Sequence, residues 1–102
     1  MPMVKFEYRM RSKVWLYPGA GGWHFVTLPK KQSGQIRSLF GVAQRGWGSL
    51  PVIATVGETS WKTSIFPDKK LGAYVLPLRA DVRKKEKITV DRVIAYSVQI
   101  LI

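Results

Sequence analysis

Apolar and charged side chains alternate along the first segment of the chain. The even positions hold the apolar residues Val4, Phe6, Tyr8, Met10, Val14 and Leu16. The odd positions hold the charged residues Lys5, Glu7, Arg9, Arg11 and Lys13. A period of two indicates a β-strand with one buried face. At Trp15 and Tyr17 the odd face becomes aromatic.

A turn and a second strand follow this segment. The run from Pro18 to Gly22 reads Pro-Gly-Ala-Gly-Gly and predicts a turn, because Gly and Pro interrupt regular structure. Residues 23–28 are rich in aromatic and β-branched side chains, which favour strands. We expect the two strands to pair as a hairpin. Pro29 ends the second one.

The spacing of apolar residues changes between residues 30 and 40. A helical spacing relates Ile36, Leu39 and Phe40. Ser33 is the expected N-cap, although Gly34 weakens the helix directly after it. Gly41 suits the C-terminal end. The pattern predicts a short helix here.

The remainder of the chain predicts four more strands and a second short helix. The strands are expected at 50–56, 60–66, 73–78 and 93–101, and the charged segment 79–87 is compatible with a helix that Val82 and Ile88 pack against the protein. The turn 57–59 makes a hairpin of the first two of these strands. Pro51 indicates an edge position or the start of a strand.

A weak internal similarity relates the two halves of the chain. Residues 25–30 (Phe-Val-Thr-Leu-Pro-Lys) precede one helix, and residues 74–79 (Tyr-Val-Leu-Pro-Leu-Arg) precede the other. Many short strands in a small chain close most easily into a barrel. We therefore expect a mainly β protein: a small closed or split β-barrel of six to seven strands with two short helices, forming one domain over residues 1–102.

Length and composition support a single folded domain. The chain has 102 residues, of which 46% are hydrophobic, and this is too apolar for a disordered protein. It contains no Cys, which excludes a disulfide scaffold and a Cys-based zinc site and agrees with a reducing cytoplasm. No signal peptide and no stretch of about 18 apolar residues is visible. We expect a soluble cytoplasmic protein without a membrane partner.

Three blocks resemble a known family. They are Arg45–Val52 (Arg-Gly-Trp-Gly-Ser-Leu-Pro-Val), Trp61–Pro67 (Trp-Lys-Thr-Ser-Ile-Phe-Pro) and Gly72–Pro77 (Gly-Ala-Tyr-Val-Leu-Pro). They look like the short bacterial and archaeal proteins that form a domain of unknown function. Those proteins are described as double-split β-barrels, some joined to a helical segment of the YdeI/OmpD-associated type. The resemblance implies a fold and no activity.

A more distant resemblance lies in the C-terminal third. The segment 76–84, followed by Ile88, Asp91 and Val93, is similar to the Pro-helix-Gly-Asp-strand element of swapped-hairpin AbrB-type DNA-binding proteins. Val90 stands where those proteins usually have Gly before the Asp. The likeness therefore implies a shared barrel more than shared DNA binding.

The residues that catalysis or metal binding requires are sparse. The single histidine, His24, lies between Trp23 and Phe25 in a predicted strand, where we expect a structural role. No pair of carboxylates has a spacing typical of acid–base or metal chemistry; the six are Glu7, Glu58, Asp68, Asp81, Glu86 and Asp91. A lone serine, for example Ser64, gives almost no indication of a serine-based catalytic site. We therefore expect that the protein is not an enzyme and that it binds neither a metal nor a cofactor.

The charge surplus is the strongest functional hint. The 17 Lys and Arg against 6 Asp and Glu give a formal charge of +11, which attracts phosphate backbones through counterion release. The candidate contacts for nucleic acid are Arg83, Lys84, Lys85 and Lys87 on the second helix, with Lys69 and Lys70 nearby and Arg45 and Trp47 from the loop 45–49. Trp15, Tyr17 and Trp47 are candidates for base stacking, whereas Trp61 and Tyr74 are expected in the core.

Other interpretations remain open. A charged surface is commonly only solvated, and net charge bears on solubility and non-specific attraction. The protein could instead be a barrel that binds a small ligand, since small closed barrels can hold one. It could also be an interaction module that binds another protein or a second copy of itself. The best statement from sequence is a non-catalytic binding module whose basic surface could contact nucleic acid.

Overall fold

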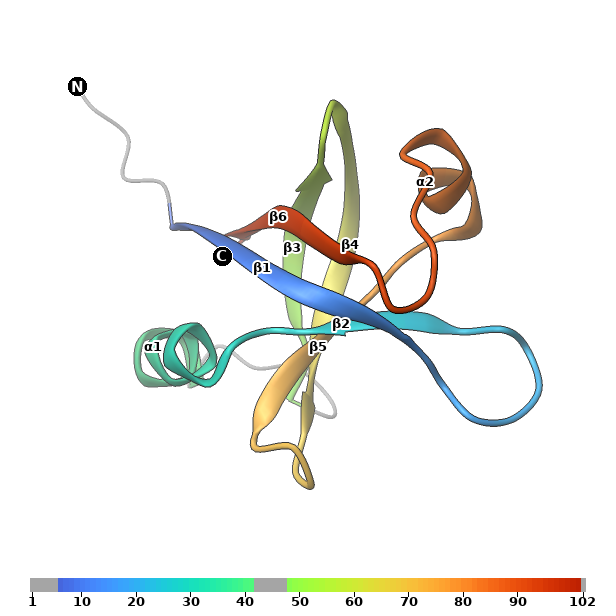
Figure 1. The fold of residues 1–102 in the computed structure, drawn as a ribbon. Helices are drawn as coiled ribbons and strands as arrows, with labels where there is room; N and C mark the ends of the chain where they lie inside the picture. Colours follow the sequence, from blue (N-terminus) through green and yellow to red (C-terminus); the bar gives the residue numbers. More distant parts are fainter. Residues whose placement is uncertain (1–5, 42–47, 102) are drawn as a thin grey trace.

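The predicted strands and helices form in the part of the chain that the computed structural model describes, residues 6–41 and 48–101. The strands are β1 (Glu7–Leu16), β2 (His24–Thr27), β3 (Leu50–Val56), β4 (Thr59–Asp68), β5 (Ala73–Pro77) and β6 (Val93–Ile100). The helices are α1 (Lys30–Phe40) and α2 (Ala80–Lys85). Within these residues six antiparallel strands close a barrel in the order β1-β2-β5-β4-β3-β6 (Figure 1). The mainly β barrel with two short helices is therefore confirmed.

Two long strands take part in both sheets of the barrel. The first part of β1, Glu7–Lys13, pairs with β6, and its last part, Val14–Leu16, pairs with β2. In the same way β4 pairs first with β3 and then, from Phe66 onward, with β5. Each long strand thus passes from one sheet to the other, and this closes the barrel with short strands elsewhere. Both predicted hairpins, β1–β2 and β3–β4, are present.

The two halves of the chain occupy equivalent positions. The Leu28 amide donates to the Tyr74 carbonyl at 2.9 Å, and the Leu78 amide donates to the His24 carbonyl at 2.9 Å. A shift of 50 residues maps one bond onto the other, because 28 + 50 = 78 and 24 + 50 = 74. The same shift maps the start of α1 at residue 30 onto the start of α2 at residue 80. The sequence similarity aligns residue 25 with 74, so the structural equivalence lies one position further.

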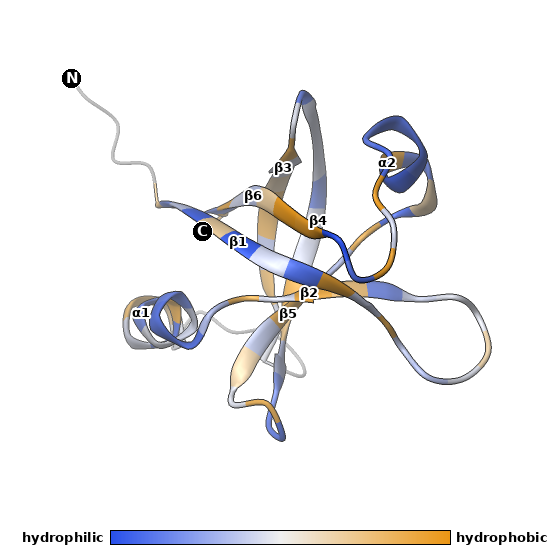
Figure 2. Ribbon diagram, viewed as in Figure 1, coloured by the Kyte–Doolittle hydropathy of each residue, from blue (hydrophilic) through white to orange (hydrophobic). Residues whose placement is uncertain are grey.

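The barrel interior contains the side chains that the period of two assigned to it. Met10 and Val14 of β1 are buried, and Trp61 and Tyr74 are buried as predicted. Hydrophobic and hydrophilic residues alternate along β1 in Figure 2. Phe6 and Leu16 depart from the pattern, being 37% and 48% exposed, because they lie at the two ends of this segment. The interior is thus filled by protein side chains rather than left open for a ligand.

The start of α1 differs from the predicted one. The helix begins at Lys30, with Pro29 as its N-cap and no side-chain cap, so Ser33 lies one turn inside. Ser33 is buried; its Oγ donates to the Leu28 carbonyl at 3.2 Å and accepts from the Tyr74 amide at 3.1 Å. The serine therefore links α1 to strand ends of both halves of the chain. Gly41 caps the C-terminal end, as predicted.

Helix α2 is shorter than the predicted segment 79–87. It ends because Lys87 adopts a left-handed backbone conformation, with φ of 54°, which an α-helix cannot contain. Val82 and Ile88 are buried, as predicted, and hold this segment against the barrel. Its charged residues face outward, with Lys84, Lys85 and Lys87 exposed.

Candidate nucleic-acid interface

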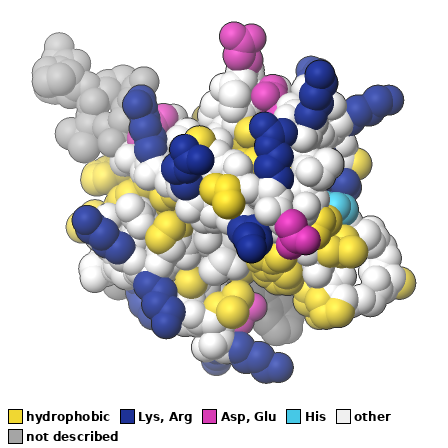
Figure 3. Space-filling view, in the orientation of Figure 1, with side chains coloured by type: hydrophobic (Ala, Val, Ile, Leu, Met, Phe, Trp, Pro, Cys, Tyr) yellow, Lys and Arg dark blue, Asp and Glu magenta, His cyan; other side chains and the backbone are white. Residues whose placement is uncertain are grey.

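Four aromatic residues of the β1–β2 hairpin lie on the outer face of the barrel. Trp15 is the cross-strand partner of Phe25, and the Tyr17 amide donates to the Trp23 carbonyl at 2.8 Å. Their neighbours Val14 and Val26 point into the core, so alternation directs these four outward. We call Trp15, Tyr17, Trp23 and Phe25 the aromatic strip. In Figure 3 hydrophobic side chains gather where this hairpin leaves the body of the barrel.

The rings of the aromatic strip form a layered arrangement around Phe25. Its ring stacks with that of Trp15 at a centroid distance of 5.1 Å and with that of Trp23 at 6.3 Å, the latter nearly parallel at 17°. Tyr17 meets Phe25 edge-on at 6.2 Å. Trp23 is 58% exposed and Tyr17 51% exposed. Exposed apolar surface of this kind is typical of interaction sites.

One side chain of the strip is fixed by a hydrogen bond. The Trp15 indole Nε1 donates to the Thr27 hydroxyl at 2.9 Å. This bond ties the ring to β2, and stacking on Phe25 holds its plane. Because a fixed ring loses little conformational entropy when it binds, Trp15 gives the strip a rigid base.

A shallow apolar depression of about 340 Å³ lies beside the strip. Tyr17, Trp23 and Phe25 form one wall, and Phe66, Val75 and Pro77 of β4 and β5 form the other. Phe66 and Val75 are cross-strand partners, and Phe66 is 40% exposed. The sheet β1-β2-β5-β4 therefore presents one continuous apolar outer surface.

A lysine lies at one end of this surface. A neighbouring depression of about 380 Å³ brings Trp15 and Tyr17 together with Asp68, Lys70 and Leu71 at the end of β4 and in the β4–β5 turn. The Leu71 amide donates to Asp68 Oδ1 at 3.1 Å, which holds this carboxylate in the turn. The depression beside Tyr17 therefore contains the Lys70 ammonium together with the Asp68 carboxylate.

Arginines lie at the other end. A third depression, of about 250 Å³, places Trp23 and His24 beside Arg79 and Arg83 at the start of α2. Arg83 Nε donates to the Leu78 carbonyl at 3.1 Å, which fixes the base of its guanidinium, and within residues 6–41 and 48–101 no carboxylate forms an ion pair with it. His24 Nδ1 lies 2.6 Å from the Gly22 carbonyl, so the histidine is part of the hairpin turn.

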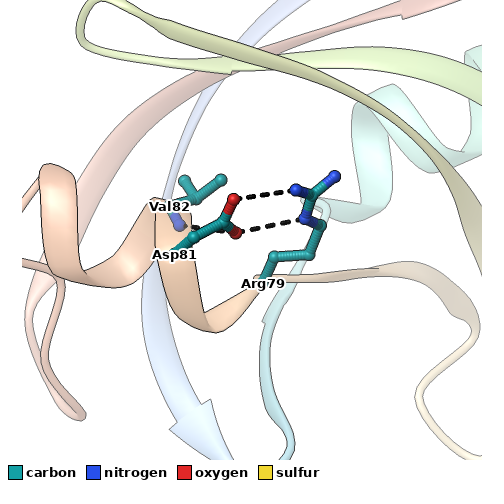
Figure 4. A network of polar contacts seen from close by, with 3 residues as sticks. All are labelled: Arg79, Asp81 and Val82. Carbon is teal, nitrogen blue, oxygen red and sulfur yellow. Dashed lines mark hydrogen bonds and ion pairs between the residues drawn. The ribbon is translucent and has the colours of Figure 1, made fainter.

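The two arginines differ in their electrostatic partners. Arg79 binds Asp81 through both carboxylate oxygens, at 3.1 Å from Nε and 2.8 Å from the terminal nitrogen (Figure 4). The hydrogen bond from Arg79 holds the pKa of the Asp81 carboxyl below its usual value, against a smaller opposing effect of desolvation. The Val82 amide also donates to Asp81. Because the charge of Arg79 is balanced, Arg83 is the stronger cation beside Trp23.

Residues 11–98 match a family described as Domain of unknown function (DUF1905). The chain belongs to this family. The match covers all six strands in part or in full and includes the aromatic strip, Lys70 and Arg83 of this DUF1905 chain. Comparison with curated proteins finds no match. The likeness of the C-terminal third to AbrB-type proteins stays a prediction.

The predicted basic residues fall into separate places on this DUF1905 barrel. Lys84, Lys85 and Lys87 are exposed on α2 and just after it, and Lys69 and Lys70 lie in the β4–β5 turn. Figure 1 shows that turn and α2 at opposite ends of the molecule, not side by side. The aromatic strip connects the two ends. Arg45 and Trp47 lie outside the described residues.

Sequence reasoning missed part of the interface. Trp23 and Phe25 were considered only as neighbours of His24, and Phe66 was given no role. The parity of positions was the available signal: residues 15, 17, 23 and 25 share odd positions across the hairpin, opposite to the buried Val14 and Val26. Of the predicted stacking residues, Tyr17 is exposed and Trp15 is half-buried.

No group of three or more His, Cys, Asp or Glu in residues 6–41 and 48–101 is placed to hold a metal ion. In the same ranges, no helix is both long enough and apolar enough to cross a membrane.

Proposed function

We propose that this DUF1905 protein is a non-catalytic binding module whose ligand is nucleic acid. One observation carries the proposal: an exposed aromatic strip has a cation at each end, Lys70 on one side and Arg83 on the other. A nucleic acid combines flat bases with a negative backbone, and this surface offers partners for both.

The electrostatics of the whole chain favour the same ligand. A formal charge of +11 on 102 residues produces a long-range attraction for a phosphate backbone. Asp81 on α2 is paired with Arg79 and therefore opposes an approaching phosphate less than a free carboxylate would. Asp68, at the other end of the strip, keeps its negative charge beside Lys70.

Two other ligands, a small molecule and a protein partner, are less favoured occupants of this surface. A small ligand would have to use an outer depression, either the apolar one beside the strip or one of about 730 Å³ that includes Arg9 and Arg11, because side chains fill the barrel interior. A protein partner would cover the apolar depression. Neither alternative accounts for the cations at both ends of the strip.

Fluorescence anisotropy with labelled single-stranded and duplex DNA and RNA tests the proposal. Titrations are run at low and near-physiological salt. The variant replaces Arg83, Lys84, Lys85 and Lys87 with Gln. The control removes the same charge from elsewhere, replacing Arg9, Arg11, Lys31 and Lys62 with Gln; all four are exposed and none lines the three depressions of the interface.

We expect binding that survives near-physiological salt and weakens at least about tenfold in the α2 variant, with a smaller loss in the control. Circular dichroism verifies that both variants are folded. The proposal fails when binding vanishes with added salt for every nucleic acid, or when both variants lose affinity equally. In that case the charge acts only as a non-specific attraction.

A further inference from the structure

We infer that the aromatic strip is a base-stacking site selective for single strands, with Trp23 and Tyr17 contacting bases and Lys70 and Arg83 contacting phosphates. The inference rests on the proposed function and goes beyond it by assigning the form of nucleic acid and the role of each side chain.

The exposure of the rings supports stacking. Trp23 lies nearly parallel to Phe25, and Phe25 in turn stacks with Trp15, so the three rings are in mutual contact through Phe25. More than half of the Trp23 side chain contacts solvent. A nucleobase placed on it would extend a stack that the protein has already built. Tyr17, beside it, offers a second exposed ring.

The shape of the site favours single strands. In a duplex the base faces are covered by their neighbours, whereas an unpaired strand can place its bases on aromatic side chains. The apolar depression beside the strip is shallow and is lined by Phe66, Val75 and Pro77. It could accept the edge of a base, and Phe66, Val75 and Pro77 offer no side-chain donor or acceptor to distinguish one base from another. We therefore expect little sequence preference.

The positions of Lys70 and Arg83 indicate how the nucleic-acid backbone would cross the aromatic strip. Lys70 shares a depression with Tyr17, and Arg83 shares another with Trp23. A backbone that crosses the strip from the β4–β5 turn toward α2 would meet one cation at each end. Arg83 is held by the Leu78 carbonyl, so its remaining guanidinium donors can contact a phosphate.

A second copy of the chain is a weaker occupant for the same surface. Two copies docked through this strip would bring their Lys70 and Arg83 side chains close together, on molecules that each carry +11. Asp81 is paired with Arg79, so Asp68, which lines the depression with Lys70, is the carboxylate that each copy offers against the two cations of the other. Charge complementarity therefore favours a polyanion.

The test compares ring variants on single-stranded and duplex probes. The variants are Trp23→Ala, Tyr17→Ala and Trp23→Phe, and the control is Leu39→Ala, which removes exposed apolar surface from α1. The probes are labelled oligothymidylate and oligouridylate of about 12 nucleotides, within the site size of small barrels, and a DNA duplex of equal length. All variants keep the full chain.

We expect Trp23→Ala to weaken single-strand binding by about 5- to 100-fold and Tyr17→Ala to weaken it less, with duplex binding unchanged. Trp23→Phe keeps a ring and should recover most of the loss. Equal affinity of Trp23→Ala and the parent for single strands overturns the stacking site but leaves the proposed function standing. If the parent protein binds no nucleic acid, both proposals fail. A monomer–dimer equilibrium abolished by Trp23→Ala would then identify the second copy as the occupant.

Discussion

Ser33 shows how one hydroxyl can join distant parts of the chain. Its Oγ bridges the Leu28 carbonyl and the Tyr74 amide, 41 positions away from Ser33. Short polar residues just before an apolar run are typical N-caps, which is why the sequence favoured that role. The sequence contains no signal for a partner so far along the chain.

Replacing Ser33 with Ala should destabilise the protein by about 1–3 kcal/mol, because the buried Tyr74 amide loses this acceptor. Urea unfolding measures the change. Ser38→Ala, an exposed position on the same helix, is the matched control and should cost much less. Equal midpoints for the two variants would show that the bridge contributes nothing.

Because of Tyr96, the stability of the folded protein depends on pH in the alkaline range. Burial raises the pKa of its phenol to about 12, and the hydrogen bond with Ser12 opposes that rise. In the unfolded chain the phenol titrates near its ordinary value of about 10. Stability from the neutral phenol is therefore complete below pH 10 and is lost as pH rises from 10 to 12, by on the order of 2–3 kcal/mol.

Tyr96→Phe isolates this effect, since Lys titration is common to both proteins. The variant should be less stable near neutral pH, because it loses the bond to Ser12, yet its stability should fall less between pH 10 and 12. Urea unfolding at stepped pH measures the difference. Parallel stability curves for variant and parent would contradict the assignment.

At the scale of elements, α2 is held by the β3–β4 turn. The Thr59 hydroxyl donates to Glu86 Oε2 at 2.6 Å, and Gly57 lies so close to the Glu86 carboxylate that a Cβ there would overlap it. Gly57 also has a φ of 57°, which side chains rarely adopt. The positive φ is thus the main reason that the turn favours glycine, and a Cβ would in addition push the end of the Glu86 side chain aside.

Gly57→Ala should destabilise the protein by at least about 1 kcal/mol, from backbone strain and from displacement of Glu86. Adding Glu86→Ala removes the overlap but not the strain, so the double variant should be more stable than the sum of the single effects predicts. Thermal unfolding of the four proteins of this cycle measures the coupling. Strict additivity would mean that the turn and the carboxylate do not interact.

Element boundaries could be predicted closely from sequence, and the reasons are local. A period of two along β1 and the Gly-rich turn at 18–22 are determined by neighbouring residues. The start of α1 was missed because Pro29 begins the helix one turn before Ser33. The length of α2 was overestimated because the left-handed Lys87 has no sequence signature.

At the scale of the whole molecule, the interface could be predicted only in part. The charge was evident from composition, and Tyr17 and Trp15 were found from the odd face of β1. The placement of Lys70 and Arg83 at the two ends of the strip that contains Trp23 could not be predicted. It depends on the pairing of β5 with β2, which joins the two halves of the chain. Sequence neighbours suggested that the β4–β5 turn and α2 act together, whereas the barrel separates them with the aromatic strip between.

The central claim is that nucleic acid binds across this strip, and nuclear magnetic resonance of the labelled protein tests it most directly. On titration with oligothymidylate, the account predicts shifts of the Trp23 and Trp15 indole signals and of amides at 15–25 and 78–83. The indole of Trp61, buried in the core, should not move. Shifts confined to the opposite sheet, around Arg9 and Ser97, would contradict the account, as would no shifts at all.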